Sequence, residues 1–234
     1  MRPSVTTTAA LAAGAVGWAL PAPAAHLPAL ADALGMPRTR PGLDGVAITF
    51  DDGPHPIATP RIAQLLADGG AKATFFMLGH QVRRTGGLAA EVASAGHTIA
   101  LHGDQHPNAL WLSPQQVLDD VRRGQETIER ATGVAPQLYR PPFGILSLPA
   151  LRAVRAAGFE VLLWSRWGRD WTSRATARSV ASRVLAPGPL TAGAVILLHD
   201  ADDHGAPDCW ESTAGALPAI LDAITQAGLH TTPL

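Results

Sequence analysis

Short apolar segments alternate with helical segments about seven times from Gly45 to the C-terminus, and this alternation constrains the fold more than any other feature. It argues for a parallel β-sheet covered by helices. The strand segments are continuously apolar, as expected when both faces of a sheet are buried. A barrel and a doubly wound sheet both fit. The predicted strands are 46–50, 73–78, 97–101, 138–140, 161–164, 194–198 and a weak one at 229–231; the predicted helices are 59–67, 88–95, 113–132, 148–157, 177–185 and 213–226.

Composition excludes several classes of protein. The 234 residues are 47% hydrophobic and 16% charged, enough apolar side chains for one large domain. The formal net charge of −1 provides no overall attraction to nucleic acid or to an anionic membrane, and we expect no nucleic-acid partner. Cys209 is the single cysteine, which excludes a disulfide framework and a cysteine-based zinc site. A transition metal would therefore have to bind histidine and carboxylate side chains.

The N-terminus has the layout of a secretory signal. A basic Met1-Arg2 precedes a small apolar run, Ala9 to Leu20, and Ala22-x-Ala24 fits a small-residue cleavage site. The run is too short to predict a membrane span with confidence. The alternative is an Ala-rich helix that packs on the domain and continues through Leu27–Leu34.

We therefore divide the chain into a signal-like or anchoring segment, residues 1–40, and a folded domain, residues 41–234. The division predicts a secreted or cell-envelope protein, with membrane anchoring through the first segment as an alternative to release. The abundance of Arg and Ala suggests a bacterial genome rich in G and C. The sequence leaves the oligomeric state open.

Chemically active side chains follow the predicted strands. In parallel α/β folds the carboxyl ends of the strands share one face, and ligands bind there. Each group taken singly has an ordinary structural explanation, such as a turn, a surface histidine or a solvated strand end. Their common placement favours one functional site. The groups are Asp51-Asp52, His102 with His106, Arg140, Asp170-Trp171, and His199-Asp200.

Two histidines and a carboxylate predict a metal centre. His102 and His106 are four residues apart, a spacing that lets two imidazoles approach one ion. Asp51 or Asp52 can supply the carboxylate, and the remaining positions stay open for water. Such a metal lowers the pKa of bound water and polarises a carbonyl group.

The remaining residues predict proton transfer. The aspartate that does not bind metal can take a proton from the water. Arg140 can pair with that aspartate and hold its orientation. His199 titrates in a range that suits protonation of a leaving group.

Five motifs resemble those of the polysaccharide deacetylase family, carbohydrate esterase family 4, with its NodB-homology domain. The likeness runs from about Gly45 to the C-terminus, with the motifs in the family's order and spacing. They are Thr49–Pro54, His102-x-x-x-His106, Arg140–Gly144, Ser165–Trp171 and Leu197–Asp200.

The resemblance implies an α/β fold, a distorted (β/α) barrel of about seven parallel strands, and a divalent metal, most commonly Zn²⁺, with Co²⁺ or Ni²⁺ as alternatives. It implies Asp51 as general base, Arg140 as its orienting partner and His199 as general acid, with Asp170 beside them. It implies Asp52, His102 and His106 as metal ligands. A backbone N–H near Phe143 would stabilise the oxyanion, Leu197 would line the pocket for the acetyl methyl group, and Trp171 would form an apolar wall against a sugar ring.

Two positions depart from the family pattern. Gly103 stands where a Ser or Thr usually braces the metal-binding loop, so the loop is either braced otherwise or looser. Trp167 stands where an additional Asp is usual, so Asp170 or Asp200 must balance the charge of the site. Asp202-Asp203-His204 is interpreted as a solvated loop.

The resemblance implies hydrolysis of N-acetyl groups on N-acetylglucosamine-containing glycans, either peptidoglycan or chitin-like oligomers. An alternative keeps the metal and changes the substrate to O-acetylated xylan or a small cyclic amide, which a substrate panel would distinguish. A non-catalytic carbohydrate-binding protein is the third hypothesis. The pair Asp51 and His199 argues against it, since binding alone requires neither.

Overall fold

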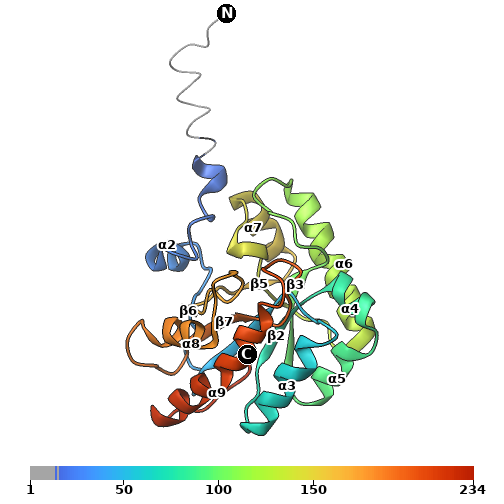
Figure 1. The fold of residues 1–234 in the computed structure, drawn as a ribbon. Coiled ribbons are helices and arrows are strands. Elements are labelled where there is room, and N and C mark those ends of the chain that lie inside the picture. Colours follow the sequence, from blue (N-terminus) through green and yellow to red (C-terminus); the bar gives the residue numbers. More distant parts are fainter. Residues whose placement is uncertain (1–13, 15) are drawn as a thin grey trace, which may run out of the picture.

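Seven parallel strands form one curled sheet, with helices packed outside it (Figure 1). A computed structural model of the chain describes residue 14 and residues 16–234. The strand order is β5-β4-β3-β2-β1-β7-β6, and every pairing is parallel. The distorted barrel that the family resemblance implies is confirmed. The strands are β1 (Ala47–Asp51), β2 (Thr74–Leu78), β3 (Thr98–Gly103), β4 (Leu138–Tyr139), β5 (Glu160–Val161), β6 (Arg166–Trp167) and β7 (Val195–His199).

The central strands are buried along their length, as their uninterrupted apolar sequences predict. All five residues of β1 and all five of β2 are buried. Helices cover the sheet between successive strands. They are α2 (Pro28–Ala33), α3 (Ala58–Asp68), α4 (Gly79–Thr85), α5 (Leu88–Ser94), α6 (Pro114–Thr132), the 3₁₀ turn η1 (Pro142–Gly144), α7 (Leu148–Ala156), α8 (Ala177–Leu185) and α9 (Trp210–Gln226).

Helix α6 has the ends that its sequence predicts. The Ser113 hydroxyl accepts the Gln116 N–H at 3.2 Å, and the Gln116 side chain accepts the Ser113 N–H at 2.9 Å. This capping box satisfies backbone donors that a helix leaves free at its start. At the other end Gly133 takes a left-handed φ of 76°, which costs glycine little.

Three elements differ from the sequence prediction. The weak strand expected at 229–231 is only a bridge between Val46 and Thr231, and the seventh strand is instead β6. With two residues, β6 is too short to show a periodic pattern. Helix α4 was not expected, because Gly79 reads as a strand stop. Gly79 instead opens the helix where the backbone passes close to Asp104: a Cβ at Gly79 would lie 2.4 Å from that carboxylate.

The residues before β1 complete one side of the barrel. The Leu163 N–H, just after β5, donates to the Pro37 carbonyl at 2.9 Å. The Arg40 N–H donates to the Gly193 carbonyl at 2.8 Å, just before β7. This stretch therefore hydrogen-bonds to segments near both ends of the sheet order.

Part of the predicted signal-like segment packs on the domain. Ala24, Ala31 and Met36 are fully buried in the main core, and Ala25 is almost so. Half of the Ala9–Leu20 run lies outside the described residues, so the division at residue 40 stays a prediction. Within the described part of the chain, no helix combines the length and apolar character needed to cross a membrane.

Candidate active site

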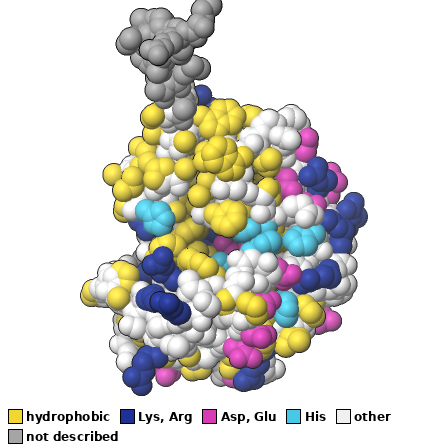
Figure 2. Space-filling view, turned by 45° about the horizontal axis from the view of Figure 1, so that its top comes forward, with side chains coloured by type: hydrophobic (Ala, Val, Ile, Leu, Met, Phe, Trp, Pro, Cys, Tyr) yellow, Lys and Arg dark blue, Asp and Glu magenta, His cyan; other side chains and the backbone are white. Residues whose placement is uncertain are grey.

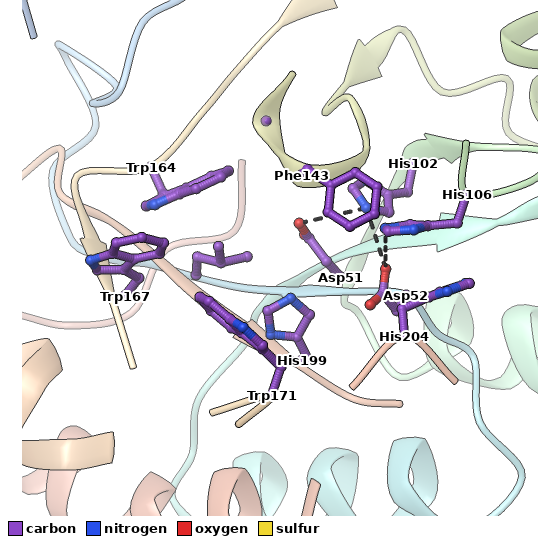
Figure 3. Close-up of a pocket in the computed structure, with 12 residues that line it drawn as sticks. Asp51, Asp52, His102, His106, Phe143, Trp164, Trp167, Trp171, His199 and His204 are labelled. Atoms are coloured by element: carbon purple, nitrogen blue, oxygen red, sulfur yellow. Dashed lines mark ion pairs between the residues drawn. The ribbon is translucent and has the colours of Figure 1, made fainter. Parts of the chain in front are cut away.

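A pocket opens at the carboxyl ends of the strands, where the sequence places its polar groups. In Figure 2 histidine side chains border a hollow rimmed by apolar ones, and Figure 3 shows the same site from within. Strands β1, β3, β6 and β7 supply Asp51, His102, Trp167, Leu197 and His199, and the segments outside the strands supply the rest. The pocket is lined by Asp51, Asp52, His102, His106, Phe143, Gly144, Trp164, Trp167, Trp171, Leu197, His199 and His204.

Asp52, His102 and His106 converge on one point. Asp52 Oδ1 lies 3.3 Å from His102 Nε2 and 3.3 Å from His106 Nε2 (Figure 3). The position of the carboxylate follows from an unusual backbone, since Asp52 has a φ of 76°, a conformation that Asp tolerates better than most residues. Strained residues of this kind concentrate at functional sites.

The donor set of this triad fits a divalent metal. His102 Nδ1 lies 2.7 Å from the Arg140 carbonyl and must donate its proton there, which leaves the Nε2 lone pair facing Asp52. Asp52 Oδ1 is buried and has no hydrogen-bond partner among the described residues. Buried acceptors that face one another need a shared cation or proton. These three residues would hold a metal, and the His–His–carboxylate set leaves further positions open for water or substrate.

The protonation states agree with this arrangement. Burial lowers the pKa of His106 to about 3, so the imidazole is neutral and can act as a ligand at neutral pH. Burial alone raises the pKa of Asp52, but the neighbouring His102, His199 and His106 outweigh it and lower that pKa below its usual range. Asp52 is therefore a carboxylate.

Asp51 is held by a fully buried arginine. Arg140 Nη1 donates to Asp51 Oδ1 at 2.7 Å and to the Thr49 hydroxyl at 2.8 Å. The other guanidinium nitrogens donate to the carbonyls of Leu162 and Leu163. Burial lowers the pKa of Arg140. The side chain nevertheless stays charged, because the ordinary pKa of arginine is very high. Asp51 Oδ2 lies 3.9 Å from His102 Nε2, beside the metal-binding position.

His199 is paired with Asp170. Its Nδ1 lies 3.0 Å from Asp170 Oδ1, and its backbone N–H donates to Asp170 Oδ2 at 2.7 Å. Burial alone lowers the pKa of His199, but the Asp170 carboxylate, helped by Asp52 and Asp51, raises it to about 10. The imidazole is thus positively charged at neutral pH and carries a proton to give, as a general acid requires.

Asp200 is not the charge partner of His199. Its carboxylate accepts the Thr59 hydroxyl at 2.5 Å, and burial raises its pKa to about 7. The same carboxylate fills the space beside Gly53, where a Cβ would lie 2.3 Å from it. Asp200 therefore packs beneath the Asp51–Gly53 turn.

The loop between His102 and His106 is braced by a residue that the sequence analysis missed. Asp120, on α6, accepts the backbone N–H groups of Asp104 at 3.0 Å and Gln105 at 3.1 Å. Gly103 has a φ of 115°, and a Cβ there would lie 2.7 Å from Asp120 Oδ2. A Ser or Thr at position 103 would clash with this carboxylate, which explains the glycine.

Aromatic and aliphatic side chains complete the lining of the pocket. Leu197 is 3% exposed on β7, and the Trp171 ring lies 5.3 Å from the His199 ring. Phe143 has a left-handed φ of 59°, is 53% exposed, and sets its ring 4.5 Å from His106. The three substrate-binding residues expected from the sequence thus all line the pocket.

His204 also lines the pocket, although the sequence analysis places it in a solvated loop. Its ring stacks on that of His106 at 3.9 Å. The preceding residues do behave as a surface loop: Asp203 pairs with Arg84 at 3.0 Å, and Asp202 lies 3.8 Å from His55. The only signal for His204 is its position five residues after His199.

Fold and site together define a parallel α/β-barrel protein with a candidate His–His–Asp metal centre and a separate acid–base pair. The family model described as polysaccharide deacetylase matches residues 39–162. The chain belongs to the polysaccharide deacetylase family, carbohydrate esterase family 4, and is a polysaccharide deacetylase.

Curated relatives share this family. The chain is 33% identical over 186 residues to a peptidoglycan-N-acetylglucosamine deacetylase of Bacillus cereus, covering 78% of this chain and 83% of the relative. It is 32% identical over 200 residues to a chitooligosaccharide deacetylase of a Bradyrhizobium strain, covering 82% and 90%.

Solved structures agree with the fold. One, a peptidoglycan N-acetylglucosamine deacetylase, superposes with a TM-score of 0.77 at 28% identity, covering 84% of this chain and 89% of the other. Another, a family 4 acetyl xylan esterase from Clostridium thermocellum in complex with a cobalt ion, has a TM-score of 0.71 at 28% identity, covering 80% and 87%.

Proposed function

We propose that this chain hydrolyses the N-acetyl groups of N-acetylglucosamine units in peptidoglycan or chitin-like glycans, with a divalent metal, most commonly zinc, at Asp52, His102 and His106. The observation that carries the proposal is the separation of roles around one pocket. Asp51 is held ready as a base by Arg140, and His199 is held protonated by Asp170. The names of the relatives support the substrate class.

The protein side chains would divide the reaction between them. A metal held by Asp52, His102 and His106 would polarise the acetyl carbonyl and make a water molecule more acidic. Asp51 takes the proton from the attacking water, and Arg140 keeps the carboxylate aimed at it. His199 donates a proton to the departing nitrogen, which leaves as a free amine beside acetate. Leu197 and Trp171 exclude solvent around the acetyl methyl group and the sugar ring.

The metal is proposed from the donor set. Imidazole nitrogens with one carboxylate suit zinc, and the same ligands accept cobalt or nickel. The unpartnered Asp52 Oδ1 supports a cation at this point. Metal analysis of the purified protein by mass spectrometry, with stoichiometry per chain, identifies the ion.

A substrate panel tests the proposed reaction. The full chain, loaded with zinc, is incubated with N-acetylglucosamine oligomers, peptidoglycan fragments and O-acetylated xylan, and the products are identified by mass spectrometry. Loss of acetyl groups from the amino sugars is the expected result. Deacetylation of xylan alone would replace the N-acetyl substrate by an ester. Binding of the oligomers with no product from any substrate would favour a carbohydrate-binding protein.

We also propose that the chain acts outside the cytoplasm, secreted or held at the cell envelope through residues 1–40. This is supported by the basic Met1-Arg2 and the apolar run to Leu20. It is also supported by the location of such glycans outside the cytoplasm. Cell fractionation of the source organism, with N-terminal mass determination of the recovered protein, tests it. Full-length protein found only in the cytoplasmic fraction would contradict export.

A further inference from the structure

A row of aromatic rings leads away from His199 toward the N-terminal segment. The Trp171 ring lies 5.3 Å from His199, the Trp167 ring 5.4 Å from Trp171, and the His26 ring 5.2 Å from Trp167. Figure 3 shows Trp171 and Trp167 beside His199, on the side of the pocket away from the metal ligands. The row thus extends past the acid–base pair.

Strand β6 aims Trp167 into the pocket. Successive side chains of a strand point to opposite faces. Arg166 points away from the site, where its guanidinium donates to the carbonyls of Val184, Gly188 and Pro189. Trp167 therefore points inward, in register with Leu197, which also lines the pocket.

Four side chains pack around the Trp167 ring, which remains half-buried: Trp171, Trp164, Arg169 and His26. The Arg169 guanidinium carbon lies 5.5 Å from its centroid, on a cation–π contact, and His26 packs against it at a tilt of 57°. Trp164 differs: it is 4% exposed and wedged against Gly144, where a Cβ would lie 2.7 Å from the indole. Trp164 is therefore buried, whereas Trp167 keeps some accessible surface for a ligand.

The charges of the site do not require an acid at position 167. Arg140 already pairs with Asp51 and donates to two backbone carbonyls, and His199 already pairs with Asp170. The family's usual Asp is therefore replaced without leaving a buried charge unpaired. The position is free for a side chain that binds.

We propose that Trp167, with His26 at its outer edge, forms a subsite for the sugar next to the one that is deacetylated. The inference rests on the proposed glycan substrate. The apolar C–H face of a pyranose ring packs on the accessible part of the half-buried indole, while the exposed imidazole of His26 offers hydrogen bonds to hydroxyl groups. The ligand is a chain of at least two sugars, and the subsite makes the protein favour oligomers over single N-acetylglucosamine.

Binding measurements test the subsite without relying on turnover. Isothermal titration of the zinc-loaded full chain compares the N-acetylglucosamine tetramer with the monomer. Trp167→Ala should weaken tetramer binding about tenfold, the scale of one lost aromatic contact, while monomer binding changes by less than about threefold. Trp167→Phe should retain most of the tetramer affinity, because phenyl also offers an apolar face.

Trp210→Ala is the matched control. Trp210 is also half-buried and packed against the core, but it lies on α9 in a separate surface depression with Arg61 and Leu65. It should leave the tetramer-to-monomer ratio unchanged. Melting temperatures of all variants verify that each is folded.

The outcomes separate the subsite from the proposed reaction. Tetramer binding that depends on Trp167 supports the subsite even if the wild type releases no acetate, in which case the proposed reaction fails alone. A wild type that binds tetramer no tighter than monomer overturns the subsite. So does a Trp167→Ala variant that loses monomer and tetramer affinity in parallel, or one that behaves like Trp210→Ala.

Discussion

Asp51 and His199 are register partners on adjacent parallel strands, each the last residue of its strand. The backbone of β1 and β7 thus fixes the spacing of the proposed base and acid before any side chain is considered. Their second partners come from elsewhere: Arg140 follows β4, and Asp170 follows β6. Asp51 pairs with the Arg140 guanidinium, and Asp170 raises the pKa of His199 so that the imidazole stays protonated, an arrangement that suits the two proposed proton transfers.

Removing either member of this pair should stop turnover without removing the metal site. Asp51→Asn and His199→Ala should each lower kcat about 10²–10⁴-fold, the usual contribution of a positioned acid or base. Steady-state acetate release measures the loss, and zinc stoichiometry should stay near that of the wild type. Near-normal turnover in both variants would exclude these roles.

The alkaline limit of activity should depend on Asp170. The general acid works only while His199 is protonated, so activity falls as pH rises through the pKa of His199. Asp170 raises that pKa, so Asp170→Asn should lower it and move the alkaline limb of kcat/KM to lower pH by roughly 1–3 units. The acidic limb should not move. An alkaline limb that is unchanged would assign it to another group.

Asp52 should strengthen metal binding without adding to the stability of the metal-free protein. At a free zinc concentration of about 100 times Kd, binding adds about 2.7 kcal/mol to the free energy of unfolding of the wild type. Asp52→Asn should lose most of this gain, because an amide is a weaker ligand. In the absence of metal the variant should be at least as stable as the wild type. The Asn amide can donate a hydrogen bond to a histidine Nε2, whereas the Asp52 carboxylate of the wild type can only accept one. Thermal unfolding with chelator and with zinc measures both effects.

The affinity of the site for zinc should depend on Asp120. Asp120→Asn removes one of two acceptors for the loop between the histidine ligands, and zinc affinity should fall roughly 10–100-fold, as for other residues that orient metal ligands. Asp119→Asn is the control, because among the residues that the structure describes Asp119 accepts only the side-chain N–H of Gln115, on the helix surface. Competition with a fluorescent chelator gives both constants. Equal zinc affinities in the two variants would mean that Asp120 does not position the ligands.

The sequence predicts those parts of the site that sit at strand ends. Asp51, His102 and His199 follow long apolar segments whose ends are readable, so their convergence follows from the parallel fold alone. Asp120 could not be found this way. It lies on α6, where an acid looks like any solvated helix position, and only the tertiary approach of the loop buries it.

Short strands and loops are the second part of the structure that the sequence could not predict. Strand β6 has two residues and no period to detect, yet it decides that Trp167 faces the pocket. His204 stacks on His106 only because its loop folds back over the site. Contacts between loops depend on packing that local sequence preferences do not encode.

Acetate release by the full chain from N-acetylglucosamine oligomers tests the central claim most directly, with the protein assayed as purified, after chelation and after zinc is restored. The account predicts release that disappears on chelation and returns with zinc. Release that is unaffected by complete removal of metal would contradict it, as would no release from a protein that binds one zinc per chain.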